Sequence, residues 1–276
     1  MKDLEPKIGT CSWNYDSWIG LVYTTKEKSS SEYLRQYSSK YNTAEIDSWF
    51  YRLPDRKTVE SYLKNVPDDF HFTCKVTNFL TMPHLRGKDS KKNQDFLSIE
   101  LFRQYIEAIK PMLNQLDAVM LEFEYLNKKK MASLDEFLKQ MVQFIREMPQ
   151  GLPIAMETRN KNYLKPEYFQ FLRENNIIHV FSEKLYMPHI YEVYDRYHDN
   201  IIGKSVIRLL GGDRKQIEQK TNHVWNNIVE PKDDLHLIAE ILRDMLKRGV
   251  DVTVNVNNHY EGSAPLTIDR LTGLLG

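Results

Sequence analysis

The sequence lacks the features that mark several common classes of protein. Only 2 of its 276 residues are cysteine, and neither Cys11 nor Cys74 belongs to a CxxC pair, which excludes the usual zinc and dithiol motifs. No apolar run approaches the roughly 18 residues of a membrane-spanning helix. Residues 1–7 are charged and lack the apolar centre of a signal peptide. We therefore expect a cytoplasmic protein with reduced thiols and no membrane partner.

The sequence also lacks an excess of either charge. Lys and Arg together number 38, as do Asp and Glu, so the net charge is zero. This balance argues mildly against a protein whose main task is to coat nucleic acid or an anionic membrane. The 8 histidines form no HxH or HExxH pair, and no GxGxxG, Walker or GxSxG motif is present. We therefore predict no metal and no cofactor.

What the sequence does contain is a regular alternation of two patterns. Short apolar or β-branched runs indicate strands at 7–12, 43–49, 71–76, 118–123, 154–159, 179–183, 205–210 and 251–257. Helical spacing lies between them at 32–40, 58–65, 96–116, 133–147, 166–175, 188–198, 233–248 and 264–274. Eight alternating units predict one domain over 1–276, a (β/α)8 barrel of eight parallel strands. A doubly wound open sheet is the alternative, and it would more often show a glycine-rich turn after its first strand.

Two connections are longer than usual, at 78–95 and 212–232. Both follow strands, so both should lie at the C-terminal end of the barrel, where binding loops gather. The first is basic and contains His84, Arg86, Lys88, Lys91 and Lys92. The sequence leaves open whether either connection closes as a lid.

Side chains alternate between the two faces of a strand, so residue parity separates the lumen of the barrel from its helix-covered face. The apolar parity should pack under the helices. The opposite parity places polar groups in the lumen: Cys11, Trp13, Glu45, Lys75, Glu122, Glu157, Arg159, Arg208, Asn255 and Asn257. The sixth strand is ambiguous, because Glu183 at its end could point either way.

Three of these lumen residues are carboxylates and three are cations, whereas an ordinary barrel lumen holds mainly Val, Ile and Leu. One interpretation is a structural network of ion pairs that fills the barrel, because an unpaired buried charge costs several kcal/mol. The other is a ligand site, and the late position of these residues in their strands favours it.

Several segments resemble the YecE-like proteins, also called domain of unknown function 72. They run from Gly9-Thr-Cys-Ser-Trp-Asn-Tyr15 through Glu45-Ile-Asp-Ser-Trp-Phe-Tyr-Arg-Leu-Pro54 and Phe72-Thr-Cys-Lys-Val76. Glu157-Thr-Arg159, Arg208-Leu-Leu-Gly211 and Asn257-Asn258 follow in the same order. The resemblance covers almost the whole chain and implies a TIM-like barrel, but it implies no reaction. The chain departs from that pattern at Leu210, where relatives usually have histidine.

The favoured functional hypothesis is a metal-independent enzyme or binder that acts on a small, polar, anionic ligand such as a sugar phosphate or nucleotide. Glu157 or Glu45 would act as the acid or base. The predicted ligand contacts are Lys75, Arg159, Arg208, Asn257, Asn258, Trp13 and Tyr51. An alternative is a nucleic-acid-binding or nucleic-acid-processing protein that contacts phosphates through the 78–95 loop. A third is a scaffold whose lumen charges are structural. The sequence gives no oligomeric state.

Overall fold

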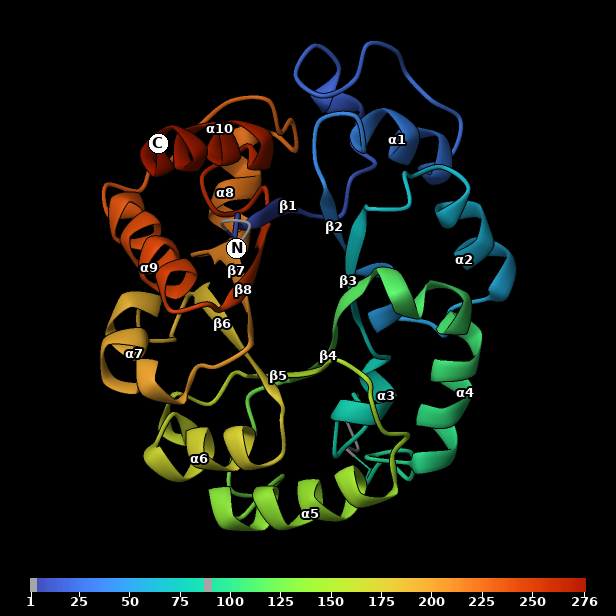
Figure 1. Ribbon diagram of the computed structural model, residues 1–276, viewed down its shortest axis with the longest axis vertical. Coiled ribbons are helices and arrows are strands. Elements are labelled where there is room, and N and C mark those ends of the chain that lie inside the picture. The colour runs from blue at the N-terminus through green and yellow to red at the C-terminus, as the bar shows by residue number, and fades with distance from the viewer. Residues whose placement is uncertain (1–3, 87–90) are drawn as a thin grey trace.

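The computed structural model describes residues 4–86 and 91–276. Eight parallel strands pair in sequence order, and the last pairs with the first to close a barrel, as predicted (Figure 1). The strands are β1 (Lys7–Cys11), β2 (Thr43–Ile46), β3 (His71–Lys75), β4 (Leu116–Phe123), β5 (Ile154–Thr158), β6 (Ile178–Lys184), β7 (Lys204–Gly211) and β8 (Asp251–Val256). The fold is therefore a TIM barrel, and the open-sheet alternative is wrong.

The helices lie around the strands, most of them in a ring outside the barrel (Figure 1). They are α1 (Ser30–Tyr37), α2 (Arg56–Leu63), α3 (Asn78–Thr81), α4 (Ile99–Ile109), α5 (Leu134–Glu147), α6 (Pro166–Glu174), α7 (Ile190–Tyr197), α8 (Arg214–Thr221), α9 (Leu235–Lys247) and α10 (Ala264–Leu275). Several begin at a side-chain cap: Ser29, Ser98 and Ser133 each accept a hydrogen bond from a backbone N–H of the first turn.

The two long connections contain helices that the sequence patterns did not predict. Helix α3 lies in the 78–95 connection and α8 in the 212–232 connection. Helix α3 has only 4 residues, and α8 is polar along most of its length with only Ile217 and Thr221 buried, so neither shows apolar helical spacing. Lys88 of the first connection lies outside the described residues.

Apolar side chains form two separate layers. The larger one fills the space between the strands and the helices, where side chains such as Phe72, Leu121 and Val254 are fully buried. The smaller one lies inside the barrel and consists of Ala118, Met120, Ala155, Ile178, Val180 and Val206. The inner layer occupies the middle of the lumen and leaves its two ends for polar groups.

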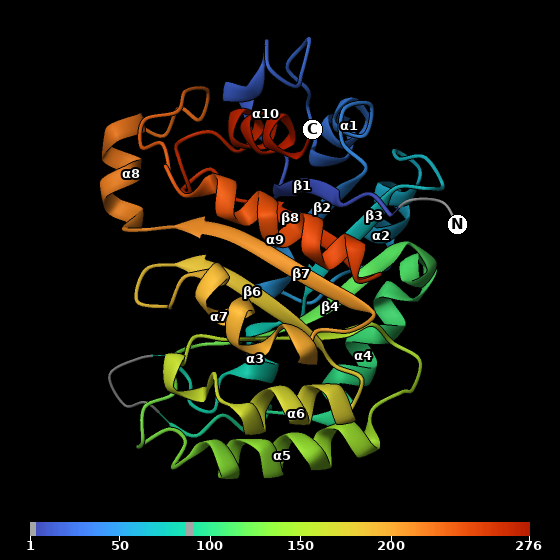
Figure 2. The ribbon, with the colours of Figure 1, turned by 60° about the vertical axis from the view of Figure 1, so that its left-hand side comes forward.

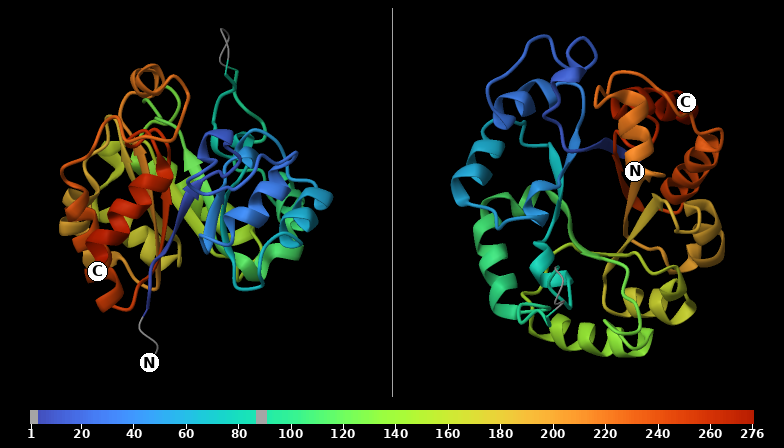
Figure 3. Two further views of the ribbon diagram at one scale, coloured as in Figure 1. Left: turned by 90° about the horizontal axis from the view of Figure 1, so that it is seen from above. Right: turned by 180° about the vertical axis from the view of Figure 1, so that it is seen from behind.

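The two ends of the barrel are distinct. The chain enters β1 from one end, and the loops that follow the strands gather at the other (Figure 3, left). Figure 2 shows α5 and α6 side by side on the outside of β4 to β6. Within the described residues no helix is long and apolar enough to cross a membrane.

Candidate functional site at the C-terminal end of the lumen

Arg208, on β7, lies at the centre of the polar cluster. Its Nε and Nη2 donate hydrogen bonds of 2.7 Å to the two oxygens of Glu45. Its Nη1 donates to Glu122 at 2.9 Å and to Glu157 at 2.5 Å. One guanidinium group from β7 therefore joins carboxylates from β2, β4 and β5. The parity analysis correctly predicted that these four side chains face the lumen.

Two further cations complete the cluster from β3 and from the end of β5. Lys75 Nζ lies 3.0 Å from Glu122 and also contacts Asp47. Arg159 Nη2 lies 2.7 Å from Glu157 and 3.3 Å from Glu122. Glu122 thus faces three cations, and its side chain is 15% exposed, compared with 0% for Glu45 and 1% for Glu157. Glu122 is the glutamate of the cluster that a ligand can reach most easily.

The pairing sets the protonation of these groups. Burial alone would raise the pKa of Glu122, but Lys75, Arg159 and Arg208 outweigh it and hold that pKa well below its usual range. Burial and Arg208 both disfavour the charged form of Lys75, yet Glu122, Asp47 and Glu45 together raise its pKa. Glu122 is therefore ionised at neutral pH, and it can accept a proton but has none to donate.

Arg159 is the cation of the cluster with an unused donor. Its Nη1 is buried and has no hydrogen-bond partner among the described residues. Lys184, at the end of β6, lies close enough for the charge of Arg159 to affect it. Burial and then Arg159 lower the pKa of Lys184, although its surface is largely exposed. The positive charge of Arg159 therefore opposes that of Lys184, and an anionic ligand near both would offset the repulsion.

A second polar cluster closes the opposite end of the lumen. Asp117, at the start of β4, accepts a 2.9 Å hydrogen bond from Thr253 and lies 3.5 Å from Lys7 and 3.4 Å from Lys204. Burial would raise the pKa of Asp117, but His71 and the two lysines outweigh it and hold the pKa below its usual range. This cluster, here called the floor, lies at the starts of the strands. Polar groups at that end of a barrel usually stabilise the fold, whereas active sites lie at the other end.

The predicted asparagines lie at the end of β8 and make internal contacts. Asn257 Oδ1 accepts a 3.0 Å hydrogen bond from the backbone N–H of His259. Asn258 Oδ1 accepts one of 2.9 Å from the N–H of Ala264, at the start of α10. Asn258 Nδ2 is buried and has no partner among the described residues. The side-chain oxygen of Asn258 thus links the end of β8 to the start of α10.

The two predicted aromatic contacts differ in outcome. Tyr51 follows β2 and is 63% exposed, so it stays available for a ligand. The lumen position predicted for Trp13 is wrong. Trp13 is 3% exposed and packs edge-on against Tyr62 of α2, with its indole N–H donating to Ser30. Ser12 adopts a φ of 81°, which ends the alternation of the strand one residue earlier.

The sequence analysis did not identify three residues that contact or lie beside the lumen cluster. Asp47 shares the parity of Glu45 and pairs with Lys75, so the two-residue spacing could have identified it. Ser182 donates a hydrogen bond to Glu157. Lys184 was hidden by the ambiguity of the sixth strand. Glu183 points toward α7, where it accepts a 2.9 Å hydrogen bond from the N–H of Ile190.

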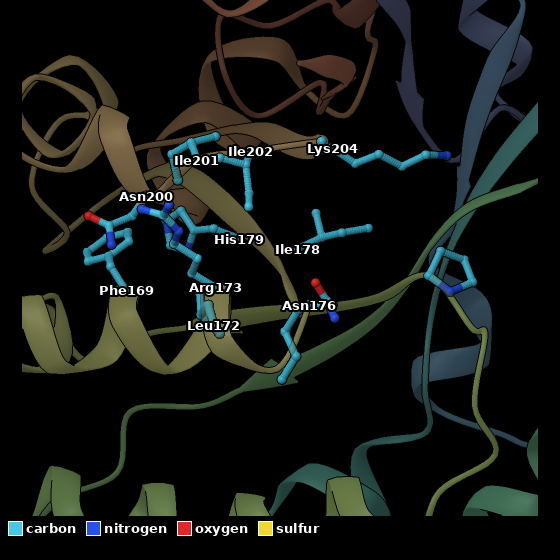
Figure 4. Close-up of a pocket in the computed structure, with 13 residues that line it drawn as sticks. Phe169, Leu172, Arg173, Asn176, Ile178, His179, Asn200, Ile201, Ile202 and Lys204 are labelled. Atoms are coloured by element: carbon cyan, nitrogen blue, oxygen red, sulfur yellow. The ribbon is translucent and has the colours of Figure 1, made fainter. Parts of the chain in front are cut away.

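A cavity of about 300 Å³ lies elsewhere, at the starts of β6 and β7 against α6 (Figure 4). Its lining includes Phe169, Arg173, His179 and Lys204. Burial lowers the pKa of His179 to about 3, so this imidazole is neutral. The cavity contains none of the predicted site residues and belongs to the opposite end of the barrel from Arg208.

No group of three or more His, Cys, Asp or Glu side chains within residues 4–86 and 91–276 is arranged to hold a metal ion. The three glutamates do converge, but the guanidinium of Arg208 occupies the position between them.

Comparison with known proteins agrees with the fold and with the sequence motifs. Residues 7–276 match the family described as protein of unknown function DUF72. The chain belongs to the DUF72 family. The resemblance inferred from the motifs is thereby confirmed.

Individual DUF72 relatives are distant. The UPF0759 protein YunF of Bacillus subtilis is 26% identical over 183 residues, which cover 62% of this chain and 58% of YunF. Crystal structures of DUF72 family proteins from Enterococcus faecalis and Thermotoga maritima are 18% and 19% identical, with TM-scores of 0.72 and 0.71. Each comparison covers 98% of this chain, and 95% and 98% of the respective relative. At such identities these structures support the fold.

Proposed function

We propose that the C-terminal end of the lumen binds a small polar ligand through an anionic group such as a phosphate or carboxylate. The observation that carries the proposal is the unused Nη1 of Arg159, a buried donor on a permanently charged group. Lys184 supplies a second positive charge beside it. Arg208 and Lys75, also predicted as anion contacts, have their donors directed at carboxylates. They would therefore act by fixing Glu122 and Glu157 in place.

The same site offers the ligand a fixed carboxylate. Glu122 is ionised, reachable from the mouth and 3.3 Å from Arg159, so a ligand held by Arg159 would lie beside it and donate a hydrogen bond to it. Glu45 and Glu157, predicted as the acid or base, lie beneath Arg208 with almost no exposed surface. In this proposal they orient Arg208, and Glu122 accepts a hydrogen bond from the ligand. The outward position of Tyr51 leaves it free to cover a sugar or base.

We also propose a cytoplasmic location, because both cysteines are free and buried.

The test compares anionic ligands with their neutral counterparts in thermal unfolding of the wild-type protein. Inorganic phosphate, glucose 6-phosphate and AMP should stabilise the protein, and glucose and adenosine should not. A ligand at about 100 times its Kd stabilises by about 2.7 kcal/mol. Arg159→Gln should remove this shift. The control Lys64→Gln, exposed at the C-terminal end of α2 and so at the opposite end of the barrel, should keep it.

Equal responses to the anionic and neutral members of each pair would overturn the proposal. So would an Arg159→Gln protein that still responds as the wild type does. A separate urea titration of Arg159→Gln shows whether the variant is folded, which separates lost binding from lost structure.

A further inference from the structure

The zero net charge of the chain conceals a local excess of positive charge at the mouth of the barrel. The loops after β4 and β5, residues 124–133 and 159–165, contain six Lys or Arg and a single acid, Glu124. Glu124 is already paired with Lys130 at 2.6 Å. Three acids follow in the first turns of α5 and α6, Asp135, Glu136 and Glu167, so the loops with these turns keep an excess of two positive charges.

Four of these cations are free to meet a partner. Lys128, Lys129, Lys161 and Lys165 are exposed, and none has a carboxylate within 4.0 Å in the described part of the chain. The loops that carry them are fixed to each other by the buried side chain of Asn160. Its Oδ1 accepts a 2.7 Å hydrogen bond from the backbone N–H of Leu126, and its Nδ2 donates one of 2.8 Å to the carbonyl of Leu126. The charges consequently lie on a preformed surface.

Exposed aromatic rings accompany the charges. Tyr125, in the first of these loops, is 62% exposed, and Tyr186, in the β6–α7 loop, is 84% exposed. Tyr186 has a φ of 70°, an uncommon conformation for a residue other than glycine, and it projects into solvent with no burial in return. A groove of about 570 Å³ runs beside it, lined by Lys161 and Arg196 among others, with Glu192 as its acidic member.

We propose that this surface, the basic rim (Lys128, Lys129, Lys161, Lys165, Tyr125 and Tyr186), binds single-stranded nucleic acid. Exposed lysines contact phosphates, and exposed tyrosines stack on unpaired bases. A duplex fits less well, because its bases already stack on each other. An acidic peptide or an anionic membrane would satisfy the lysines but gives the two tyrosines no planar partner. The rim lies outside the lumen, so its function does not depend on the anion site at Arg159.

The test is fluorescence anisotropy with labelled oligo(dT) and oligo(U) of about 20 nucleotides. If about four phosphates are neutralised, log K should fall with log salt at a slope of about −3. That slope corresponds to roughly 50-fold weaker binding when salt rises from about 50 to about 200 mM. Lys161→Glu with Lys165→Glu should weaken binding at least tenfold and make the slope shallower by about 1.4.

The tyrosines are tested separately. Tyr125→Ser with Tyr186→Asn should weaken binding by roughly tenfold or more without changing the salt slope, because stacking releases no counterions. Asparagine is chosen because it tolerates the positive φ of Tyr186. The charge control is Lys64→Glu with Lys247→Glu, at the C-terminal ends of α2 and α9 and therefore at the opposite end of the barrel. It should bind within about twofold of the wild type.

Three results would overturn the proposal. One is no binding of either oligonucleotide at low salt. Another is equal weakening by the rim and control pairs, which would indicate non-specific attraction. The third is full displacement by inorganic polyphosphate, polyglutamate or anionic vesicles at matched charge with no effect of the tyrosine variants, which would assign the rim to a different polyanion. Loss of phosphate binding in Arg159→Gln with oligonucleotide binding intact would instead bear on the lumen site alone.

Discussion

Replacing Arg208 with methionine tests whether the lumen cluster depends on its central cation. Methionine keeps an unbranched, apolar stem and removes the guanidinium group, with its charge and all its hydrogen bonds. Glu122 and Glu157 would keep Lys75 or Arg159 at 3.0 Å or less. Glu45, which is fully buried, would keep only Lys75 at 3.9 Å. The variant therefore leaves one buried carboxylate without a close cation.

The expected loss of stability follows from the one buried carboxylate that loses its close cation. Removing one partner of a buried ion pair costs about 3–5 kcal/mol, which is a large part of the roughly 5–15 kcal/mol that stabilises a typical domain. We expect the free energy of unfolding of Arg208→Met, from urea titration at neutral pH, to fall by about that amount. Adding Glu45→Gln to the variant should recover more than half of the loss, because it removes the uncompensated charge.

The loss should also depend on pH. In the wild type the depressed pKa of Glu122 contributes stability that is present above its unfolded-state value of 4.5 and is lost as the pH falls through the folded-state value. In the variant, a buried carboxylate without a cation favours the protonated form, so folding binds a proton. The difference between the two proteins should therefore shrink from neutral pH to about pH 5.

The surface pair of Arg56 with Glu60, 2.9 Å apart on α2 and well exposed, provides the control. Arg56→Met should cost less than about 0.5 kcal/mol. A loss below about 1 kcal/mol for Arg208→Met, or a loss that is the same at both pH values, would refute the account of Arg208 as the cation that holds the buried carboxylates.

Three other predictions concern parts of the barrel away from Arg208. Asp117→Asn should destabilise the floor by about 2–4 kcal/mol; because the pKa of Asp117 is lowered, the deficit in urea titrations should be full above the ordinary value of 3.8 and shrink as the pH falls through the folded-state value. Gly211→Ala should lower the melting temperature far more than Gly203→Ala. Both glycines have a positive φ, of 82° and 68°, but only at Gly211 would a Cβ lie 2.1 Å from a backbone oxygen; similar melting temperatures would contradict the close approach. Burial raises the pKa of Cys74 to about 12 and that of Cys11 well above its usual range. A thiol-reactive dye at about pH 8 should therefore label neither cysteine in the folded protein and both in urea, and rapid labelling of the folded protein would count against the packing around β1 and β3.

The barrel could be predicted from the sequence because most of its strands are buried on both faces. Runs such as Leu116–Phe123 and Asp251–Val256 are apolar enough to stand out, and the helices between them have strong apolar periodicity. The same two-residue period then identified the residues around Arg208. The two-residue alternation does not predict which carboxylate each cation contacts. Those contacts depend on side-chain rotamers and on the stagger between strands.

The failures occur where the backbone leaves the regular pattern. Trp13 was placed in the lumen because the alternation of β1 was extended past Ser12, whose positive φ turns the chain. The face of Glu183 was left open because it ends the strand, yet β6 keeps its alternation: Ser182 contacts Glu157, and Glu183 contacts α7. The extra residue in the pairing with β7 is Leu210, which faces no partner on β6 and shifts the register there. Because the face of Glu183 was left open, Lys184 was not recognised as a neighbour of Arg159.

The two polar ends of the lumen bear differently on the choice between a structural network and a ligand site. At the floor, each lysine lies on a carboxylate: Lys7 is 2.6 Å from Asp251, and Lys204 is 3.4 Å from Asp117. That arrangement pairs both lysines of the floor, although the buried Nδ1 of His71, 3.2 Å from Asp117, makes no hydrogen bond among the described residues. At the other end, Arg159 keeps a buried donor unused, and the charge of Arg159 makes Lys184 harder to protonate. A network selected only for stability would remove such a group or pair it, because an unsatisfied buried donor costs about 1–3 kcal/mol. Retaining that cost at the end of the barrel where the strand-end loops gather is the behaviour expected of a binding site.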